Sequence, residues 1–196
     1  MRPRTALIAV LALAVAAPVP ASAATKKKRT PPPPPACMLV TDAPGDGKSG
    51  SGFVSSDALD IISGDIATGK TEIVAVLRLK SNAFKDTWHY GGYTWRLAGT
   101  AAGQRWVFRA GNDAWGNVNS AMEVGTTGIP QAKFELGPNN TLIWRAKRSD
   151  VAALAKPNLV WTDFAANTAW LSTPADYTDL SKKVYKDKQS SCVVAK

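Results

Sequence analysis

The feature that most constrains the fold is a series of short apolar or alternating runs, each closed by glycine, asparagine, aspartate or proline. The clearest run covers residues 71–80, where apolar side chains at every second position from Ile73 to Leu79 share one face. Val74 and Val76 occupy the middle of the other face. A period of two predicts a strand, and apolar residues on both faces predict a central strand covered on both sides.

The remaining runs predict further strands joined by turns. Gly137-Pro138-Asn139-Asn140 predicts a hairpin turn, and residues 99–103 predict the connection between two more strands. Residues 149–156 have the cap and charge pattern of a short crossover helix. The chain is therefore expected to form an all-β, antiparallel, jelly-roll-like sandwich with one short helix. The further expected strands are 38–41, 59–66, 93–97, 104–110, 131–136 and 141–146, with one or two within 158–172.

The N-terminus predicts export. A basic start precedes an apolar stretch at 6–17, then Pro-Val-Pro, then the small-residue triplet at 21–23. This is the layout of a secretory signal peptide covering residues 1–23, and its apolar part is short for a membrane span. We expect a secreted, extracellular protein with no transmembrane segment in the mature chain. A retained membrane anchor is the alternative.

Residues 24–36 predict a linker, because five consecutive prolines favour an extended polyproline rod. The basic cluster Lys26, Lys27, Lys28 and Arg29 could contact an anionic cell envelope, or could serve as a solubilising spacer. From residue 37 onward there are 18 Lys and Arg against 15 Asp and Glu. The predicted domain, residues 37–196, is therefore only slightly basic, and nucleic acid is not an expected partner.

The chain contains two cysteines, Cys37 and Cys192, one at each end of the predicted domain. In an exported protein an isolated pair predicts a disulfide, which would bring the first and last strands side by side. Two free thiols or a redox pair are the alternative, although Cys-x-x-Cys spacing is missing from the sequence.

The stretch 42–60 favours calcium. It holds four aspartates and four glycines within nineteen residues. Calcium takes six to eight oxygen ligands, and glycine-rich loops let backbone carbonyls turn inward. The predicted ligands of a structural calcium are Asp42, Asp46, Asp57 and Asp60. Ordinary side-chain-capped turns and a strand start are the alternative interpretation of the same residues.

These same residues carry a resemblance to a known family. Asp42-x-Pro44-Gly45-Asp46, Leu-Asp-Ile at 59–61 and the strand at 73–79 together resemble exported bacterial β-sandwich modules of the DOMON and family 9 carbohydrate-binding type. The resemblance covers mainly residues 40–97. It implies a jelly-roll-like sandwich, calcium near the Asp42 loop, and a sugar or other small ligand at an aromatic face.

Aromatic residues are concentrated in the middle of the chain. Those in strand-like runs are expected in the core, whereas Trp88, Tyr90 and Trp115 fall in expected loops. Exposed rings can stack on sugars, so these three are the candidate ligand-binding residues. His89 is the only histidine, and the sequence contains no Gly-x-Ser-x-Gly elbow and no zinc-type cluster.

The sequence thus favours binding over catalysis. The expected function is an exported binding or surface-interaction module, with a cell-wall or extracellular glycan as ligand and calcium as structural cofactor. Two alternatives remain. One is a secreted hydrolase with a carboxylate pair that only the fold assembles. The other is a structural, protein-binding domain recognised by an exposed apolar patch.

Overall fold

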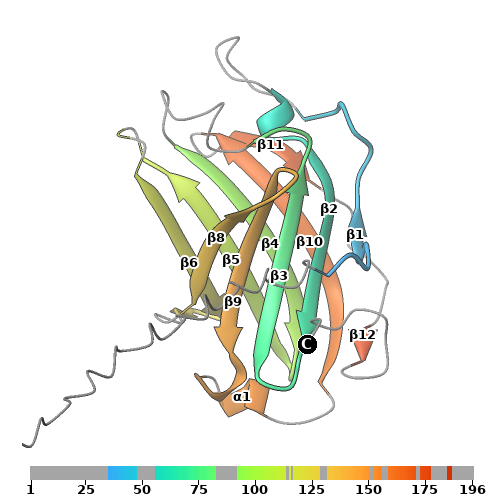
Figure 1. Ribbon diagram of the computed structural model, residues 1–196, viewed down its shortest axis with the longest axis vertical. Coiled ribbons are helices and arrows are strands. Elements are labelled where there is room, and N and C mark those ends of the chain that lie inside the picture. Colours follow the sequence, from blue (N-terminus) through green and yellow to red (C-terminus); the bar gives the residue numbers. More distant parts are fainter. Residues whose placement is uncertain are drawn as a thin grey trace, which may run out of the picture. The chain divides into compact units, whose positions relative to one another are not determined.

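The computed structural model describes residues 35–47, 56–82, 92–113, 115, 117–128, 132–150, 152–155, 159–170, 173–177 and 185–186. In these residues the strands form two antiparallel sheets, A and B, that pack face to face (Figure 1). The predicted all-β antiparallel sandwich with one short α-helix is confirmed. The predicted signal peptide and nearly all of the predicted linker lie outside the described residues.

Sheet A has the strand order β1-β2-β3-β9-β8. Its strands are β1 (Val40–Thr41), β2 (Ile61–Thr68), β3 (Glu72–Leu79), β9 (Thr141–Lys147) and β8 (Lys133–Gly137). Sheet B has the order β11-β10-β4-β5-β6-β7, with β12 also paired to β10. Its strands are β11 (Thr173–Tyr177), β10 (Val160–Trp170), β4 (Tyr93–Ala101), β5 (Gln104–Asn112), β6 (Val118–Val124), β7 (Thr127–Gly128) and β12 (Tyr185–Lys186).

Three short helical segments within the described ranges connect these strands. The 3-10 turn η1 (Ser56–Ala58) precedes β2, while η2 (Arg148–Asp150) and α1 (Ala152–Ala155) form the crossover from β9 in sheet A to β10 in sheet B. The crossover helix was expected at this place. Arg148 fastens it to the sandwich, because its buried side chain donates to the Leu154 and Gly69 carbonyls, each at 2.9 Å.

Strand β3 is central in sheet A, as its two apolar faces predicted. It pairs with β2 on one side and with β9 on the other. Ile73, Ala75 and Leu77 belong to the main core between the sheets. Val74 and Val76 face away from that core and are nevertheless fully buried, in a second small apolar cluster with Ile143 of β9.

The connection between β4 and β5 is shorter than the sequence predicted. The turn consists of Ala102 and Gly103 alone, both with positive φ (52° and 73°), and Ala101 pairs with Gln104. Such two-residue turns match the twist of the flanking strands. The expectation that Gly99 begins the connection was wrong. Gly99 lies inside β4, where a Cβ would come within 3.0 Å of Ile66 Cδ1, so its lack of a side chain provides space between the sheets.

The hairpin turn expected between β8 and β9 is confirmed. Gly137 pairs with Thr141, and Asn139 and Asn140 adopt the positive φ angles (55° and 58°) that asparagine tolerates. Strand β6, in contrast, was not predicted. Its sequence Val-Asn-Ser-Ala-Met-Glu-Val is mostly polar or small, and only Met122 is fully buried. Its conformation depends on pairing with β5, which extends along the whole of β6.

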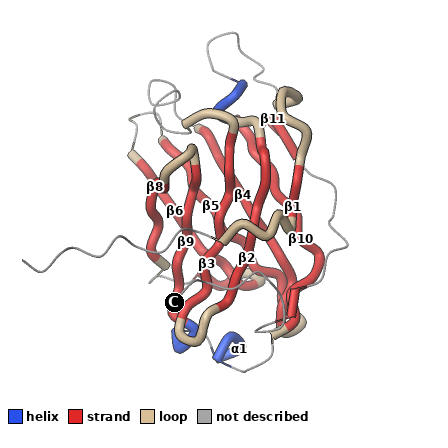
Figure 2. The backbone as a smooth tube through the Cα atoms, turned by 45° about the vertical axis from the view of Figure 1, so that its right-hand side comes forward, coloured by secondary structure: helices blue, strands red, loops and turns tan. Residues whose placement is uncertain are grey.

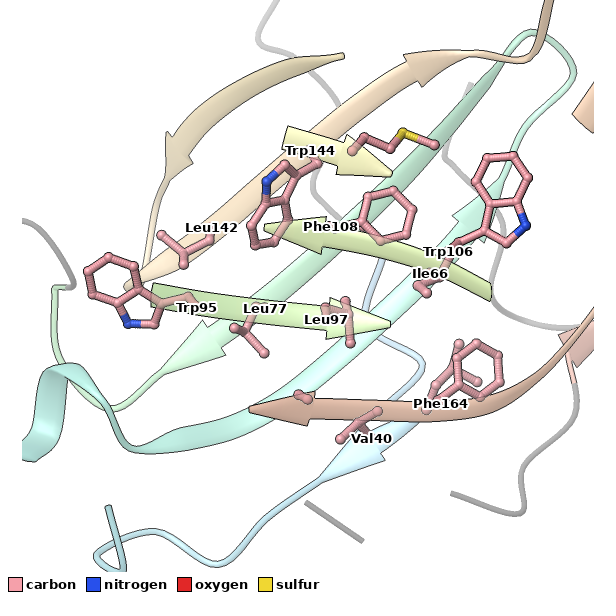
Figure 3. Packing of buried hydrophobic residues seen from close by; sticks show 14 of the residues in the cluster. Val40, Ile66, Leu77, Trp95, Leu97, Trp106, Phe108, Leu142, Trp144 and Phe164 are labelled. Atoms are coloured by element: carbon pink, nitrogen blue, oxygen red, sulfur yellow. The ribbon is translucent and has the colours of Figure 1, made fainter. Parts of the chain in front are cut away.

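The core between the sheets is rich in tryptophan (Figure 3). Three fully buried indoles donate to backbone carbonyls: Trp95 to Ala58 at 2.8 Å, Trp106 to Ala101 at 3.1 Å and Trp144 to Arg109 at 3.0 Å. Buried polar groups are costly unless hydrogen-bonded, so these bonds let indoles fill the core. The third bond also crosses from sheet A to sheet B, which fixes how the two sheets are aligned.

Residues 35–39 form a strap on the outer face of sheet A, which Figure 2 shows as a loop crossing β2 toward β3. The backbone N–H groups of Cys37 and Leu39 both donate to Asp65 Oδ1 at 3.1 Å. Arg78 of β3 donates to Asp65 Oδ2 and to the carbonyl of Pro35. The buried carboxylate of Asp65 therefore fastens the strap to sheet A. Met38, with φ of 52°, lies between the two residues that donate to it.

The predicted bridge between Cys37 and Cys192 stays a prediction, because Cys192 lies outside the described residues. The expected side-by-side arrangement of the first and last strands does not take the form of a direct pairing. Strand β1 pairs with β2 in sheet A, whereas β12 pairs with Val160 and Trp161 at the start of β10 in sheet B.

Candidate binding site at the loop end of the sandwich

Most of the predicted site residues belong to one end of the sandwich, the end at which η1 lies (top of Figure 1). The indole of Trp95, near the start of β4, donates to the Ala58 carbonyl in η1. Tyr93, at the start of the same strand, pairs with Asn112 at the end of β5. The loop that follows Asn112 and the aspartate-rich segment before β2 are therefore at the same end.

The backbone at 57–60 is held by donors from two strands, β4 and β10, and from the two residues that follow β3. The carbonyls of Ala58 and Leu59 accept from the side chains of Trp95 and Thr168, at 2.8 and 2.7 Å. The backbone carbonyl of Asp57 accepts from the N–H of residue 81, and that of Asp60 accepts from the N–H of residue 80, both at 3.0 Å. All four carbonyls are thus engaged, and this anchoring fixes where the Asp57 and Asp60 side chains project.

Asp57 and Asp60 converge on the ammonium of Lys80. Lys80 Nζ lies 2.8 Å from Asp57 Oδ1 and 3.7 Å from Asp60 Oδ2. The hydrogen bond to Asp57 is the largest cause that raises the pKa of Lys80 above its ordinary 10.5. Lys80 therefore supplies positive charge where calcium was predicted to supply it.

The glycine-rich loop after β1 also reaches Asp60. The Gly45 N–H donates to Asp60 Oδ2 at 2.6 Å, and Gly47 lies so close that a Cβ there would be 2.8 Å from the Asp60 Cα. Asp60 is 1% exposed, and its Oδ1 has no hydrogen-bond partner among the described residues. The structure thus brings Asp57, Asp60 and the loop at 45–47 together, as the calcium prediction required.

The other two predicted ligands belong to the chain segment after β1, and Asp46 is part of the loop at 45–47. Asp42 follows β1, its N–H donating to the Ile62 carbonyl at 3.2 Å, and its Oδ1 accepts from the next N–H, that of Ala43, at 2.9 Å. Asp46 is exposed. Within the described ranges, no group of three or more His, Cys, Asp or Glu side chains is placed to hold a metal ion. Calcium therefore stays a prediction, with an incomplete set of ligands.

Trp115 is an exposed aromatic residue at this end. Its exposed fraction is 88%, whereas the indoles of residues 95, 106, 144 and 161 are completely buried. The turn that carries it is built on Asp113. Asp113 Oδ1 accepts from the N–H groups of Trp115 (2.9 Å) and Asn117 (2.8 Å), and Oδ2 accepts from the Asn117 amide at 2.8 Å. The bonds from Asn117 and Trp115 lower the pKa of Asp113 below 3.8.

Trp88 and Tyr90, the other two candidate stacking residues, lie outside the described residues, as does His89. The described end of their loop is fastened beside the Trp115 turn. The Gly92 N–H donates to the Asn112 carbonyl at 2.8 Å, and the Tyr93 N–H donates to Asn112 Oδ1 at 3.1 Å. Buried Asn112 is therefore the common anchor of both loops, a role that the sequence did not reveal.

The three glutamates belong to the outer faces of the sheets. Glu72 and Glu135 both pair with Arg145 on sheet A, at 3.4 and 2.9 Å. Glu123 pairs with Arg109 on sheet B, at 3.3 Å. Each glutamate that could serve in hydrolysis is thus engaged by an arginine.

Comparison with known proteins returned no match to a family model, to a curated protein or to a solved structure. None of the helices among the described residues has the length and apolar character needed to cross a membrane.

Proposed function

We propose that this chain is an exported, non-catalytic binding module whose loop end recognises a cell-wall or extracellular glycan. The observation that carries the proposal is the 88% exposure of Trp115 on a turn pre-organised by three hydrogen bonds to Asp113. A large ring held in solvent loses little conformational freedom on binding and can stack on the apolar face of a sugar. The resemblance to DOMON and family 9 carbohydrate-binding modules agrees with this proposal.

The arrangement of the loops supports the same ligand. Loops positioned by a rigid sandwich commonly carry its binding function. The segment containing Trp88 and Tyr90 is followed by Gly92, whose N–H donates to the Asn112 carbonyl. Asn112 directly precedes Asp113, whose carboxylate holds the Trp115 turn. We propose that both loops contribute aromatic rings to one glycan-binding end.

Calcium is the proposed structural cofactor of this end. The support is the buried Asp60 Oδ1 without a described partner, together with Gly45 and Gly47 packed against the same residue. A bound cation would join the loop at 45–47 to Asp57 and Asp60. The ammonium of Lys80 competes for the same two carboxylates.

The test of the glycan proposal is retention of the purified protein on peptidoglycan sacculi and on cellulose. Replacing Trp115 with Ala should weaken retention roughly five- to thirty-fold, which corresponds to about 1–2 kcal/mol of stacking. Leu136→Ala is the matched control, since Leu136 is an exposed apolar side chain (49%) in sheet A. Equal retention of both variants and the wild type on either glycan would refute the role of Trp115.

A further inference from the structure

The outer face of sheet B carries an arrangement of arginines that the glycan proposal does not use. Arg96 of β4 and Arg109 of β5 are directly opposite each other in the register. Both side chains face away from the core, because their neighbours in the strands, Trp95, Leu97, Phe108 and Ala110, are buried in it. Like charges directly opposite on adjacent strands are destabilising, with Cβ atoms only about 5 Å apart.

These two arginines are poorly neutralised. The Arg96 side chain is exposed and makes no ion pair or hydrogen bond with the part of the chain that the structure describes. Arg109 has one acidic partner, Glu123, whose Oε1 lies 3.3 Å from Nη2. The Arg109 Nε is buried without a hydrogen-bond partner among the described residues. An arginine can bind a carboxylate with two parallel N–H donors, and Glu123 contacts only one nitrogen of Arg109, Nη2.

The surroundings of the pair are small and polar. The positions of sheet B that border it on the same face include Thr94, Ala98, Val107, Ala121 and Asn167, which are partly exposed, and Gly111, which is buried. None of them is a large side chain that would stand above the sheet. Arg105, further along β5, is already engaged by the Asp163 carbonyl and by Thr100. The face is thus a shallow surface with two basic groups at its centre.

We propose that this face of sheet B binds an acidic polysaccharide, with Arg96 and Arg109 taking the carboxylates of its sugars. A carboxylate is the favoured group because Arg109 already binds one, that of Glu123, within the chain. An extended polymer can lie along a shallow sheet face, and its negative charge removes the repulsion between the two arginines. The proposal is independent of Trp115, since the arginines belong to the sheet and Trp115 to the loop after β5.

The experiment uses protein expressed from the full sequence and measures its affinity for polygalacturonate, with dextran as the neutral polymer and polyphosphate as the phosphate polymer. We expect binding to polygalacturonate that weakens as salt is raised, and at least ten-fold weaker binding for Arg96→Gln with Arg109→Gln. Arg145→Gln, which removes an arginine from the outer face of sheet A, is the matched control and should bind as the wild type does.

A second variant separates lost binding from lost folding. Glu123→Gln removes the internal carboxylate that competes for Arg109, so it should strengthen binding to polygalacturonate two- to three-fold. A double arginine variant that binds like Arg145→Gln would overturn the proposal. So would polyphosphate binding that equals or exceeds polygalacturonate binding, or a Glu123→Gln variant that binds more weakly than the wild type.

Discussion

The carboxylate of Asp65 and the guanidinium of Arg78 lie 2.5 Å apart on adjacent strands at the outer face of sheet A. The Asp65 side chain is completely buried and that of Arg78 is 20% exposed. The same carboxylate accepts the N–H groups of Cys37 and Leu39, and the same guanidinium donates to the Pro35 carbonyl. This ion pair therefore fastens the strap, residues 35–39, to β2 and β3 of sheet A.

Breaking this pair should be costly. Asp65→Asn leaves the Arg78 charge without its buried partner, and such a loss typically destabilises by about 3–5 kcal/mol. The measurement is the free energy of unfolding in denaturant. Glu135→Gln is the control, because it breaks a pair whose acid is 54% exposed and should cost less than about 1 kcal/mol. Similar losses in the two variants would show that the strap does not depend on Asp65.

Gly99→Ala tests the role of this residue in sheet packing. The added Cβ would lie 3.0 Å from Ile66 Cδ1 and 3.2 Å from atoms of Phe164 and Trp161, so overpacking should cost about 1–3 kcal/mol. Gly128→Ala is the matched control, since nothing lies within 4 Å of a Cβ there. If thermal unfolding shows equal midpoints for the two variants, the core relaxes more easily than the contacts indicate.

The Trp115 turn should depend on pH through Asp113. The folded-state pKa of Asp113 is lowered from 3.8, chiefly by the Asn117 side chain. The stabilisation is therefore fully present above the unfolded-state pKa, and it is lost as pH falls through the folded-state value. We expect hydrogen-exchange protection of the Trp115 and Asn117 amides to be constant above pH 3.8 and to fall only at lower pH. In Asp113→Asn the protection should not vary with pH over this range. If this variant loses protection at low pH as the wild type does, a group other than Asp113 is responsible.

Calcium can be tested by thermal unfolding with calcium and with a chelator. A ligand that binds only the folded state stabilises it, by about 1.4 kcal/mol at ten times its dissociation constant. We expect calcium to raise the midpoint of thermal unfolding in the wild type. It should raise the midpoint more in Lys80→Met, in which the competing ammonium is removed from Asp57 and Asp60. An unchanged midpoint in both proteins would end the calcium proposal, and Asp60→Asn should abolish any rise.

The disulfide between Cys37 and Cys192 is the fifth prediction. Cys37 is fastened to Asp65 in β2, and β12 pairs with β10. Five residues lie between Lys186 and Cys192, so the six residue steps can span up to about 20 Å. The mature protein should be two hydrogens lighter than the reduced form, with no thiol reactive under denaturing conditions. On the chain-entropy model, closing the loop contributes about 4–5 kcal/mol. Two reactive thiols would contradict the bridge.

The strands that the sequence predicted well are those in which the pattern of apolar side chains is enough to show which faces are buried. Residues 71–80 carry apolar side chains on both faces, and β3 is the central strand of sheet A. The hairpin at Asn139 and Asn140 was equally readable, because positive φ restricts the choice of residue locally. The side chains of residues 118–124 carry no such signal. This segment forms β6 because each of its residues pairs with a residue of β5.

The candidate site shows the same division. Candidate residues could be named from local composition alone: aspartates beside glycines, and aromatic residues in polar loops. The fold was needed to find that Lys80 meets Asp57 and Asp60, that Asn112 anchors two loops, and that Arg96 faces Arg109. These contacts join strands that are distant in the chain. Their partners depend on sheet order and register, which are set by how the whole core packs rather than by any local pattern.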